Sequence, residues 1–431
     1  MKNIMRRYLL LLTLLAWACL LTAQTTLQKQ LESLPHVGKV ESLENTVGFA
    51  EKYQVSFVQD LDHAHPESGS FSQRVFVMHM GYDRPTVMVT EGYGAGRTAY
   101  PGYNEELAKI LNANIVVVEH RYFLESTPEP INWNYLTVEN SAYDLHRINQ
   151  TLKKIYPKKW LSTGISKGGQ TTNFYRAFFP DDVEVSVPYV APLCYEVEDG
   201  RHEPFLRNFA GTTQERKAIL DFQIEVLKRR AQLLPLFEKL CTEKAYKFRM
   251  SMTEIYDYSV LEYSYAFWQW GTSPDSIPPL SASDKDIFDH WMKISSPDYL
   301  ISESGITSFF VQAARELGYY GYDIKPFEGL LKIESAKGYL AKLFLPEPVQ
   351  DIAFDPTVYN KVEQFMSTTD AKMIFIYGEY DPWSAAAVTN PHSPNILYLV
   401  APKGSHRARI NNLPEEMKEQ AIKTLKDWML D

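Results

Sequence analysis

Cysteine is scarce in this chain, which has three in 431 residues, at positions 19, 194 and 241. None of them has the close spacing to another cysteine that structural zinc sites use, so we expect no metal ion, and no motif calls for a cofactor. Cys194 and Cys241 leave two alternatives open: one disulfide, of the kind that forms in oxidising compartments, or two unpaired buried thiols.

A block of positive charge is also missing. Lysine and arginine number 44 against 53 aspartates and glutamates, which gives a net charge of −9. Proteins that bind nucleic acids concentrate basic side chains in a patch or stripe. The composition therefore argues against a nucleic-acid partner.

The apolar run at residues 8–21 covers 14 positions, fewer than the roughly 20 that a membrane-spanning helix needs. Three basic residues precede it and small residues follow near Ala23, which predicts a secretory signal peptide over residues 1–23. Its removal would change the net charge from −9 to −12, because it takes away three positive charges and no negative one. We expect an exported protein, periplasmic or extracellular. Cys19 also offers a lipoprotein attachment site, but Trp17 fits that motif poorly, so an outer-membrane lipoprotein is the less favoured alternative.

Strand and helix patterns alternate in the first and last parts of the chain. Continuous apolar runs predict buried strands and 3.6-residue spacing predicts helices, while alternation at 71–80 predicts an antiparallel strand. Strands are expected at 85–90, 114–119, 160–163, 183–190, 372–378 and 396–400, and helices at 103–111, 138–156, 170–179 and 414–429. This order indicates a mostly parallel, doubly wound sheet with helices on both faces.

The strand patterns stop between residues 195 and 345. Long helical stretches such as 213–240 replace them, and aromatic residues accumulate at 256–270. We predict a helical cap over residues 195–345, inserted into a core that consists of residues 24–194 and 346–431.

The stretch Gly164–Gly169 reads Gly-Ile-Ser-Lys-Gly-Gly and joins the strand at 160–163 to the helix that follows. A G-x-S-x-G sequence between a strand and a helix is the nucleophile elbow of α/β-hydrolases, in which a strained turn exposes the serine. Small residues must flank such a serine because a Cβ would clash within the turn. The alternative is a glycine-rich turn without chemistry. We predict an α/β-hydrolase fold with Ser166 as its nucleophile.

An acid and a base follow in the order that this fold uses. Asp381 comes just after the strand at 372–378, and His406 just after the strand at 396–400. Open α/β sheets place their sites at the carboxyl ends of strands, so both residues are expected beside Ser166. His406 would take the proton from the serine and return it to the leaving amine, and Asp381 would hold the imidazole tautomer.

The oxyanion that forms in such a reaction needs two N–H donors. We expect one from the backbone of Lys167, at the start of the elbow helix, where the helix dipole also helps. The other is expected from Tyr93, in the glycine-rich loop after the strand at 85–90. This loop is not a phosphate loop, because the terminal lysine and hydroxyl residue of that motif are missing.

These motifs resemble those of the secreted bacterial prolyl tri-/tetrapeptidyl aminopeptidases. The elbow, the Asp-Pro-Trp segment at 377–383 and the segment 403–406 carry the resemblance. The sequence Glu-His-Arg-Tyr at 119–122, with Glu-Ser at 125–126, is similar to a block in lysosomal Pro-X carboxypeptidase and dipeptidyl peptidase II. The chain departs from these lysosomal relatives at Lys167, where they carry a tyrosine.

The resemblance implies a serine exopeptidase that cuts after proline. Such an enzyme releases short proline-ended peptides from the N-terminus of peptide substrates through an acyl-enzyme, here on Ser166. Ser166, Asp381 and His406 match the triad of the family residue by residue.

Five residues are candidates for substrate binding: two tryptophans, two residues at a strand end, and one acid. Aromatic walls suit a rigid, apolar prolyl ring, so Trp268 in the aromatic stretch and Trp383 after Asp381 are candidate pocket residues. Glu119 and Arg121 are also candidates, although a structural network at a strand end is the stronger interpretation for them.

An aminopeptidase also needs an acid that pairs with the α-ammonium group of its substrate. Glu254, Asp257 and Glu262 all lie in or beside the aromatic stretch, and Glu262 is our candidate. The alternative for all three is an ordinary solvated helix charge.

Two other functions compete with a peptidase. An esterase or lipase on small acyl esters would use the same scaffold. A catalytically inactive protein that captures peptides or glycans is less favoured, because the nucleophile, the base and the acid are all present.

Overall fold

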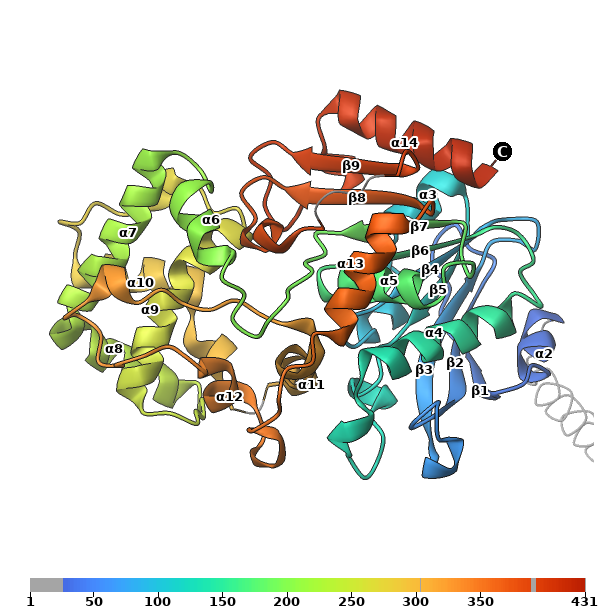
Figure 1. Ribbon diagram of the computed structural model, residues 1–431, viewed down its shortest axis with the longest axis horizontal. Coiled ribbons are helices and arrows are strands. Elements are labelled where there is room, and N and C mark those ends of the chain that lie inside the picture. Colours follow the sequence, from blue (N-terminus) through green and yellow to red (C-terminus); the bar gives the residue numbers. More distant parts are fainter. Residues whose placement is uncertain (1–25, 303, 389–392, 431) are drawn as a thin grey trace, which may run out of the picture.

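The computed structural model describes residues 26–302, 304–388 and 393–430. The predicted signal peptide and Cys19 lie outside these residues. One sheet runs through the larger body of the molecule, with strands in the order β1-β2-β3-β5-β4-β6-β7-β8-β9 (Figure 1). They are β1 (Val37–Ser42), β2 (Glu51–Asp60), β3 (Ser70–His79), β4 (Thr86–Thr90), β5 (Asn114–Val118), β6 (Trp160–Ile165), β7 (Val185–Tyr189), β8 (Lys372–Gly378) and β9 (Ile396–Ala401).

The sheet is antiparallel at one edge and parallel elsewhere. β2 pairs antiparallel with β1 and β3, and β3 pairs antiparallel with β5. All pairings from β5 through β4 to β9 are parallel. This confirms the predicted antiparallel strand and the predicted α/β-hydrolase fold, while β1 and β2 were not predicted.

Helices cover both faces of the sheet because alternate strand residues point to opposite sides. On one face, Ile115 and Val117 pack with α3 (Glu106–Leu111) and α14 (Glu415–Leu430). On the other, Val116 and Val118 pack with α2 (Thr26–Glu32) and α4 (Val138–Leu152). α5 (Lys167–Phe178) lies beside α4, and α13 (Thr357–Thr368) packs on α5.

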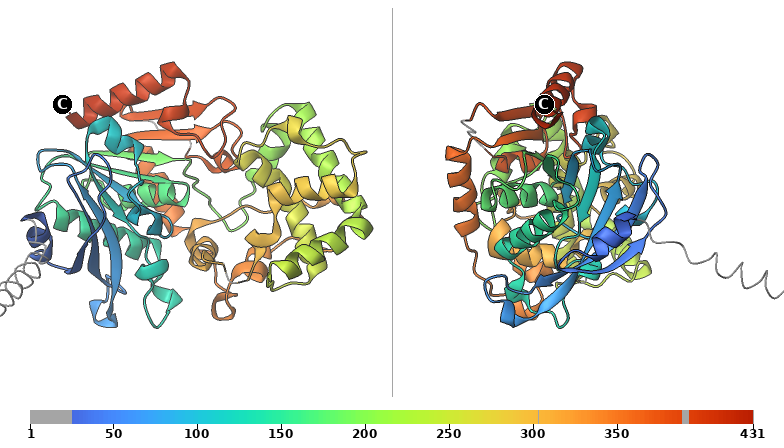
Figure 2. Two further views of the ribbon diagram at one scale, coloured as in Figure 1. Left: turned by 180° about the vertical axis from the view of Figure 1, so that it is seen from behind. Right: turned by 90° about the vertical axis from the view of Figure 1, so that its right-hand side faces the viewer.

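A group of helices between β7 and β8 lies beyond one end of the sheet (Figure 1 and the left view of Figure 2). We call it the cap; it contains α6 (His202–Asn208), α7 (Thr213–Lys228), α8 (Arg230–Glu243), α9 (Met252–Gln269), α10 (Asp284–Ser295), α11 (Thr307–Gln312) and α12 (Tyr339–Phe344). The division of the chain at residues 195 and 345 stays a prediction. None of the helices in the described ranges is both long and apolar enough to cross a membrane.

The helical stretch expected at 213–240 is helical and consists of two helices. α7 ends at Lys228 and α8 begins at Arg230. The side chain of Arg229 binds Glu225 and Asp284 as well as two backbone carbonyls of the segment before α10. These contacts hold the chain in a bend that helical spacing alone does not reveal.

Cys194 and Cys241 are both buried and both free. Burial raises the pKa of the Cys241 thiol to about 11 and that of Cys194 further. Of the two alternatives that the sequence left open, the structure therefore contains the unpaired thiols.

Candidate active site

Ser166 lies in the turn between β6 and α5 with a strained backbone, at φ 58° and ψ −121°. A Cβ at Gly164 would lie 2.2 Å from the carbonyl oxygen of Gly168. A Cβ at Gly168 would lie 2.8 Å from the carbonyl oxygen of Thr90. The turn therefore requires glycine on both sides of the serine, as expected for a nucleophile elbow.

Asp381 and His406 lie together after β8 and β9. The Nδ1 atom of His406 is 2.7 Å from the Oδ2 atom of Asp381, and both side chains are buried. The other carboxylate oxygen of Asp381 accepts the backbone N–H of Trp383. The two loops also join directly, because the Tyr380 N–H donates to the carbonyl of Gly404. Because Nδ1 of His406 faces Asp381, the Nε2 atom on the other side of the ring is available for proton transfer.

Ser166 and His406 line one cavity of about 910 Å³ between the sheet and the cap. The Nε2 atom of His406 is buried and has no hydrogen-bond partner among the described residues, so the serine and the histidine are not hydrogen-bonded here. Such bonds are often open in enzymes without substrate and tighten when substrate binds. The cavity can hold a peptide of several residues.

Both expected oxyanion donors line this cavity. Gly92 precedes Tyr93, and a Cβ there would lie 2.6 Å from the Cβ of Lys167. The loop after β4 therefore crosses directly over the first residue of α5. This brings the backbones of Tyr93 and Lys167 to the same end of the cavity as Ser166.

The side chain of Lys167 is buried beside the elbow. Its Nζ atom is 5.8 Å from the ring centroid of Tyr93 and 5.4 Å from that of Phe123. Desolvation lowers the pKa of Lys167 well below its usual value. The lysine at this position thus packs against aromatic rings.

Glu262 of α9 lines the cavity and is almost fully buried. Its carboxylate accepts hydrogen bonds from the hydroxyls of Tyr320, at 2.9 Å, and Tyr322, at 2.6 Å. Desolvation raises the pKa of Glu262 to about 7 in spite of these two donors. Among the described residues its partners are these two tyrosines and no basic side chain, and such a buried carboxyl group is suited to bind a cationic group of a ligand.

The other two candidate acids are used elsewhere. Glu254 forms the capping box of α9 with Ser251, on the surface. Asp257 is paired with Arg230 and accepts the backbone N–H groups of residues 332 and 333. The structure thus singles out Glu262 among the three.

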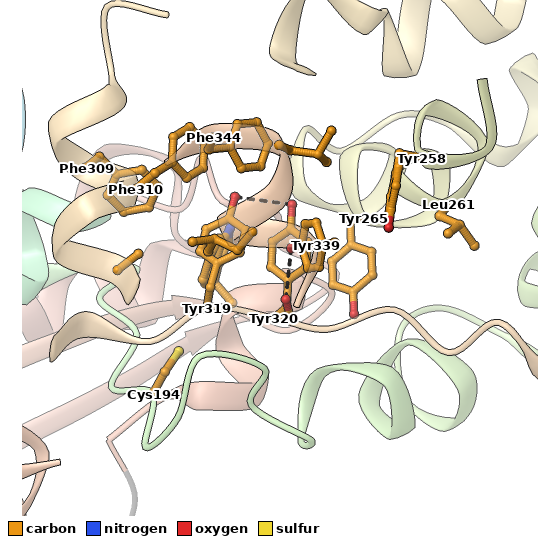
Figure 3. Close-up of a cluster of buried hydrophobic side chains, with 14 of the residues drawn as sticks. Cys194, Tyr258, Leu261, Tyr265, Phe309, Phe310, Tyr319, Tyr320, Tyr339 and Phe344 are labelled. Atoms are coloured by element: carbon orange, nitrogen blue, oxygen red, sulfur yellow. Dashed lines mark hydrogen bonds between the residues drawn. The ribbon is translucent and has the colours of Figure 1, made fainter. Parts of the chain in front are cut away.

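Trp383 lines the cavity beside His406, with their ring centroids 6.4 Å apart. Its ring also lies 5.3 Å from the rings of Tyr319 and Tyr320. Figure 3 shows these two tyrosines within a larger group of aromatic side chains, between Phe309 and Phe310 on one side and Tyr265 and Tyr258 on the other. Tyr319 and Tyr320 were not among the predicted site residues, although the dense Tyr-Tyr-Gly-Tyr stretch from residue 319 was a usable signal.

Trp268 does not line the cavity, contrary to the prediction. Its ring fills the space beside Gly211, where a Cβ would lie 2.2 Å away, and contacts Tyr380. Trp270, two residues later, is half exposed and lines the cavity instead. Trp270 directly follows the last residue of α9, so the two rings point in different directions, and Trp268 packs between the cap and Tyr380.

Glu119 and Arg121 do not line the cavity either, which corrects their place among the substrate-binding candidates. Glu119 accepts hydrogen bonds from Arg74, Ser126 and the backbone of Ala95. Arg121 makes a two-pronged ion pair with Asp144 and donates to three backbone carbonyls. Both are structural residues at the end of β5.

Comparison with known proteins also indicates a peptidase. Residues 23–430 match the family described as PS-10 peptidase S37. The chain belongs to the S37 peptidase family. This S37 peptidase is therefore a serine peptidase, and its substrates are peptides.

Among its relatives, the prolyl tri/tetrapeptidyl aminopeptidase of Streptomyces mobaraensis is 30% identical over 384 residues, covering 87% of this chain and 79% of its own. Lysosomal Pro-X carboxypeptidase of Mus musculus is 29% identical over 207 residues, 43% of this chain and 41% of its own. Among solved structures, a proline iminopeptidase from Mycobacterium smegmatis has a TM-score of 0.44 and 12% identity, covering 87% of this chain and 99% of its own.

Proposed function

We propose that this S37 peptidase releases proline-ended tri- or tetrapeptides from the free N-terminus of peptides. Ser166 is the nucleophile, His406 the base and acid, and Asp381 the residue that orients His406. Lys167 and Tyr93 supply the two backbone N–H donors for the oxyanion. The similarity to the Streptomyces mobaraensis aminopeptidase supports this choice of substrate.

The observation that carries the proposal is the course of α9. Glu262 lies on this helix, and seven residues later the carbonyl of Gln269 accepts the backbone N–H of His406. At 1.5 Å per residue this is about 10 Å of helix. An extended tri- or tetrapeptide spans about 10 to 14 Å. A substrate whose ammonium group binds Glu262 therefore presents its third or fourth residue near His406.

The pocket beside His406 suits proline at that residue. Trp383, Tyr319 and Tyr320 form aromatic walls, and an apolar ring without a backbone N–H leaves no buried donor unsatisfied there. Pairing of the ammonium group with Glu262 at the far end supplies a few kcal/mol, because both groups are shielded from water.

The reaction follows from the arrangement of the triad. Ser166 Oγ attacks the prolyl carbonyl carbon while its proton passes to the Nε2 atom of His406. The oxyanion accepts the N–H groups of Lys167 and Tyr93. Collapse breaks the peptide bond, and the leaving amine takes the proton from His406. Water then hydrolyses the acyl-enzyme by the same route.

A small substrate panel tests this proposal. It contains p-nitroanilides of Ala-Ala-Pro and Ala-Ala-Ala-Pro, each with a free and an acetylated N-terminus, and one short acyl ester. We expect release from the free-amine peptides, strong loss on acetylation, and no release by Ser166→Ala. Cleavage of the ester without cleavage of the anilides would favour an esterase. A fluorophosphonate probe that does not label Ser166 would favour a binding protein.

We also propose that the protein is exported, to the periplasm or the medium. The support is the pattern of residues 1–23, a basic start followed by an apolar run. Intact-mass analysis of the protein purified from the periplasm and from the medium tests this. A chain that starts near residue 24 is expected, and a lipid-modified Cys19 would instead indicate membrane anchoring.

A further inference from the structure

The mouth of the cavity on the His406 side is rich in arginine, in a chain whose net charge is −9. Arg407 follows His406 directly, Arg409 comes two residues later, and Arg97 lies in the loop after β4; all three line the cavity. Arg409 is occupied, because its guanidinium donates to the backbone carbonyls of residues 406 and 408. Arg407 and Arg97 make no ion pair with any described residue.

The guanidinium of Arg407 makes no hydrogen bond to another residue in the described part of the chain. Its guanidinium carbon is 5.7 Å from the ring centroid of Trp270, at the end of α9. Stacking on an aromatic ring orients a guanidinium but uses none of its N–H groups. A stacked arginine of this kind is suited to bind a carboxylate through two parallel hydrogen bonds.

Glu91, six residues before Arg97, also lines the cavity and could offset the positive charge of the arginine. Burial raises its pKa to about 7, although Arg97 acts in the opposite direction. The negative charge of Glu91 is therefore incomplete at neutral pH. Arg97 and Arg407 thus line the cavity together with a carboxyl group whose negative charge is disfavoured by burial.

The chemistry of the triad assigns this end of the cavity to the leaving part of the substrate. His406 gives its proton to the leaving amine, so the leaving peptide starts at His406 and extends away from Glu262. One or two residues cover about 3.5 to 7 Å. A short leaving peptide thus ends close to the residue that follows His406.

We propose that Arg407, assisted by Arg97, binds the C-terminal carboxylate of a leaving group of one or two residues. The enzyme then recognises both ends of a short oligopeptide: the ammonium group at Glu262 and the carboxylate at Arg407. Its preferred substrates are tetra- to hexapeptides with two free ends. This inference rests on the proposed direction of the substrate along α9.

The test compares Ala-Ala-Pro-Ala with its C-terminal amide, which differs in charge alone. Ala-Ala-Pro-Asp amide, with its negative charge on a side chain, distinguishes the two possible sources of a carboxylate. The parent is expected to favour the free acid over the amide about tenfold in kcat/KM. In Arg407→Gln this ratio is expected to fall towards one, whereas Arg407→Lys keeps part of it. Arg249→Gln removes an exposed arginine of the cap that does not line the cavity and should keep the full ratio.

The outcomes separate the two proposals. If the parent cleaves these peptides after proline but shows no preference for the free acid, the arginine site is wrong and the proposed function stands. The same holds if Arg407→Gln retains the full ratio. If the aspartyl amide equals the free acid, the site binds a side-chain carboxylate and the limit on peptide length is wrong. If no free-amine proline peptide is cleaved, both proposals fail.

Discussion

The carbonyl of Gln269, the last residue of α9, accepts a hydrogen bond from the backbone N–H of His406 at 3.0 Å. The rings of Trp270 and His406 are also in contact, with centroids 6.2 Å apart. The cap therefore touches the histidine loop directly. Because Glu262 is on the same helix, one rigid element connects the proposed ammonium site to the proposed base.

Gly271 tests this connection, because it has φ +68° and a Cβ there would lie 3.0 Å from the Oγ atom of Ser405. Gly271→Ala pushes the loop that carries His406. We expect kcat to fall about tenfold with little change in KM, since small displacements of catalytic groups are costly. Gly329→Ala is the matched control, because Gly329 has φ +77° and open space around its Cβ position. Equal kinetics of the two variants would contradict the connection.

Glu262→Gln should weaken the binding of free-amine peptides. We expect kcat/KM for Ala-Ala-Pro anilide to fall about 100-fold, because the ammonium group then lies in a buried site without a counter-charge. For N-acetylated substrates, kcat/KM should differ much less between the parent and the variant. If free and acetylated substrates lose activity equally, Glu262 is a structural residue.

The raised pKa of Glu262, about 7, makes this pairing depend on pH. The carboxylate forms as pH rises through 7, while the substrate amine, with a pKa near 8, is charged below that value. KM for free-amine peptides should therefore increase as pH falls from 7.5 to 6. In Glu262→Gln this dependence of KM on pH should disappear.

Asp381→Asn should remove most of the activity without unfolding the protein. An asparagine can still accept the backbone N–H of Trp383, but its amide favours the wrong imidazole tautomer at His406. We expect kcat to fall about 10⁴-fold, with a melting temperature close to that of the parent. A fall of tenfold or less would mean that Asp381 does not orient the base.

The sequence predicted the parts of this molecule that local pattern controls. The strand–serine–helix turn requires glycine at positions that the sequence displays, and Asp381 and His406 directly follow strong strand patterns. The substrate-binding residues were predicted less well, because Trp268 and Trp270 differ only in the direction in which the helix turns them. Tyr320 reaches Glu262 from 58 residues away, and no local pattern encodes such a contact.

The two free cysteines predict insensitivity to reduction. Cys194 and Cys241 are buried and not bonded to each other, so a reducing agent should leave the melting temperature of a chain without residues 1–23 unchanged. Ellman's reagent should modify two thiols only after unfolding, because buried thiols with raised pKa values react slowly. A loss of stability on reduction would show that a disulfide forms after all.

The contact between cap and core at Glu316 predicts a site-specific dependence of stability on pH. Glu316 lies in the π-helical turn η7 (Ala313–Leu317), and its carboxylate accepts the backbone N–H of Val138 at the start of α4, at 2.8 Å. Burial raises the pKa of Glu316 to about 7, against about 4.3 in an unfolded chain. The folded state thus holds an extra proton between these values, and the contribution of this group to stability is lost as pH rises from about 4 through 7.

Glu316→Gln keeps the acceptor for Val138 and cannot ionise. The variant and the parent should therefore unfold alike near pH 5, and the variant should become the more stable by about 2 kcal/mol near pH 8. Denaturant unfolding at both pH values measures the difference, and Glu238→Gln, at an exposed site on α8, serves as the control. A Glu316→Gln effect that is the same at pH 5 and pH 8 would mean that the cap–core contact carries no titrating group.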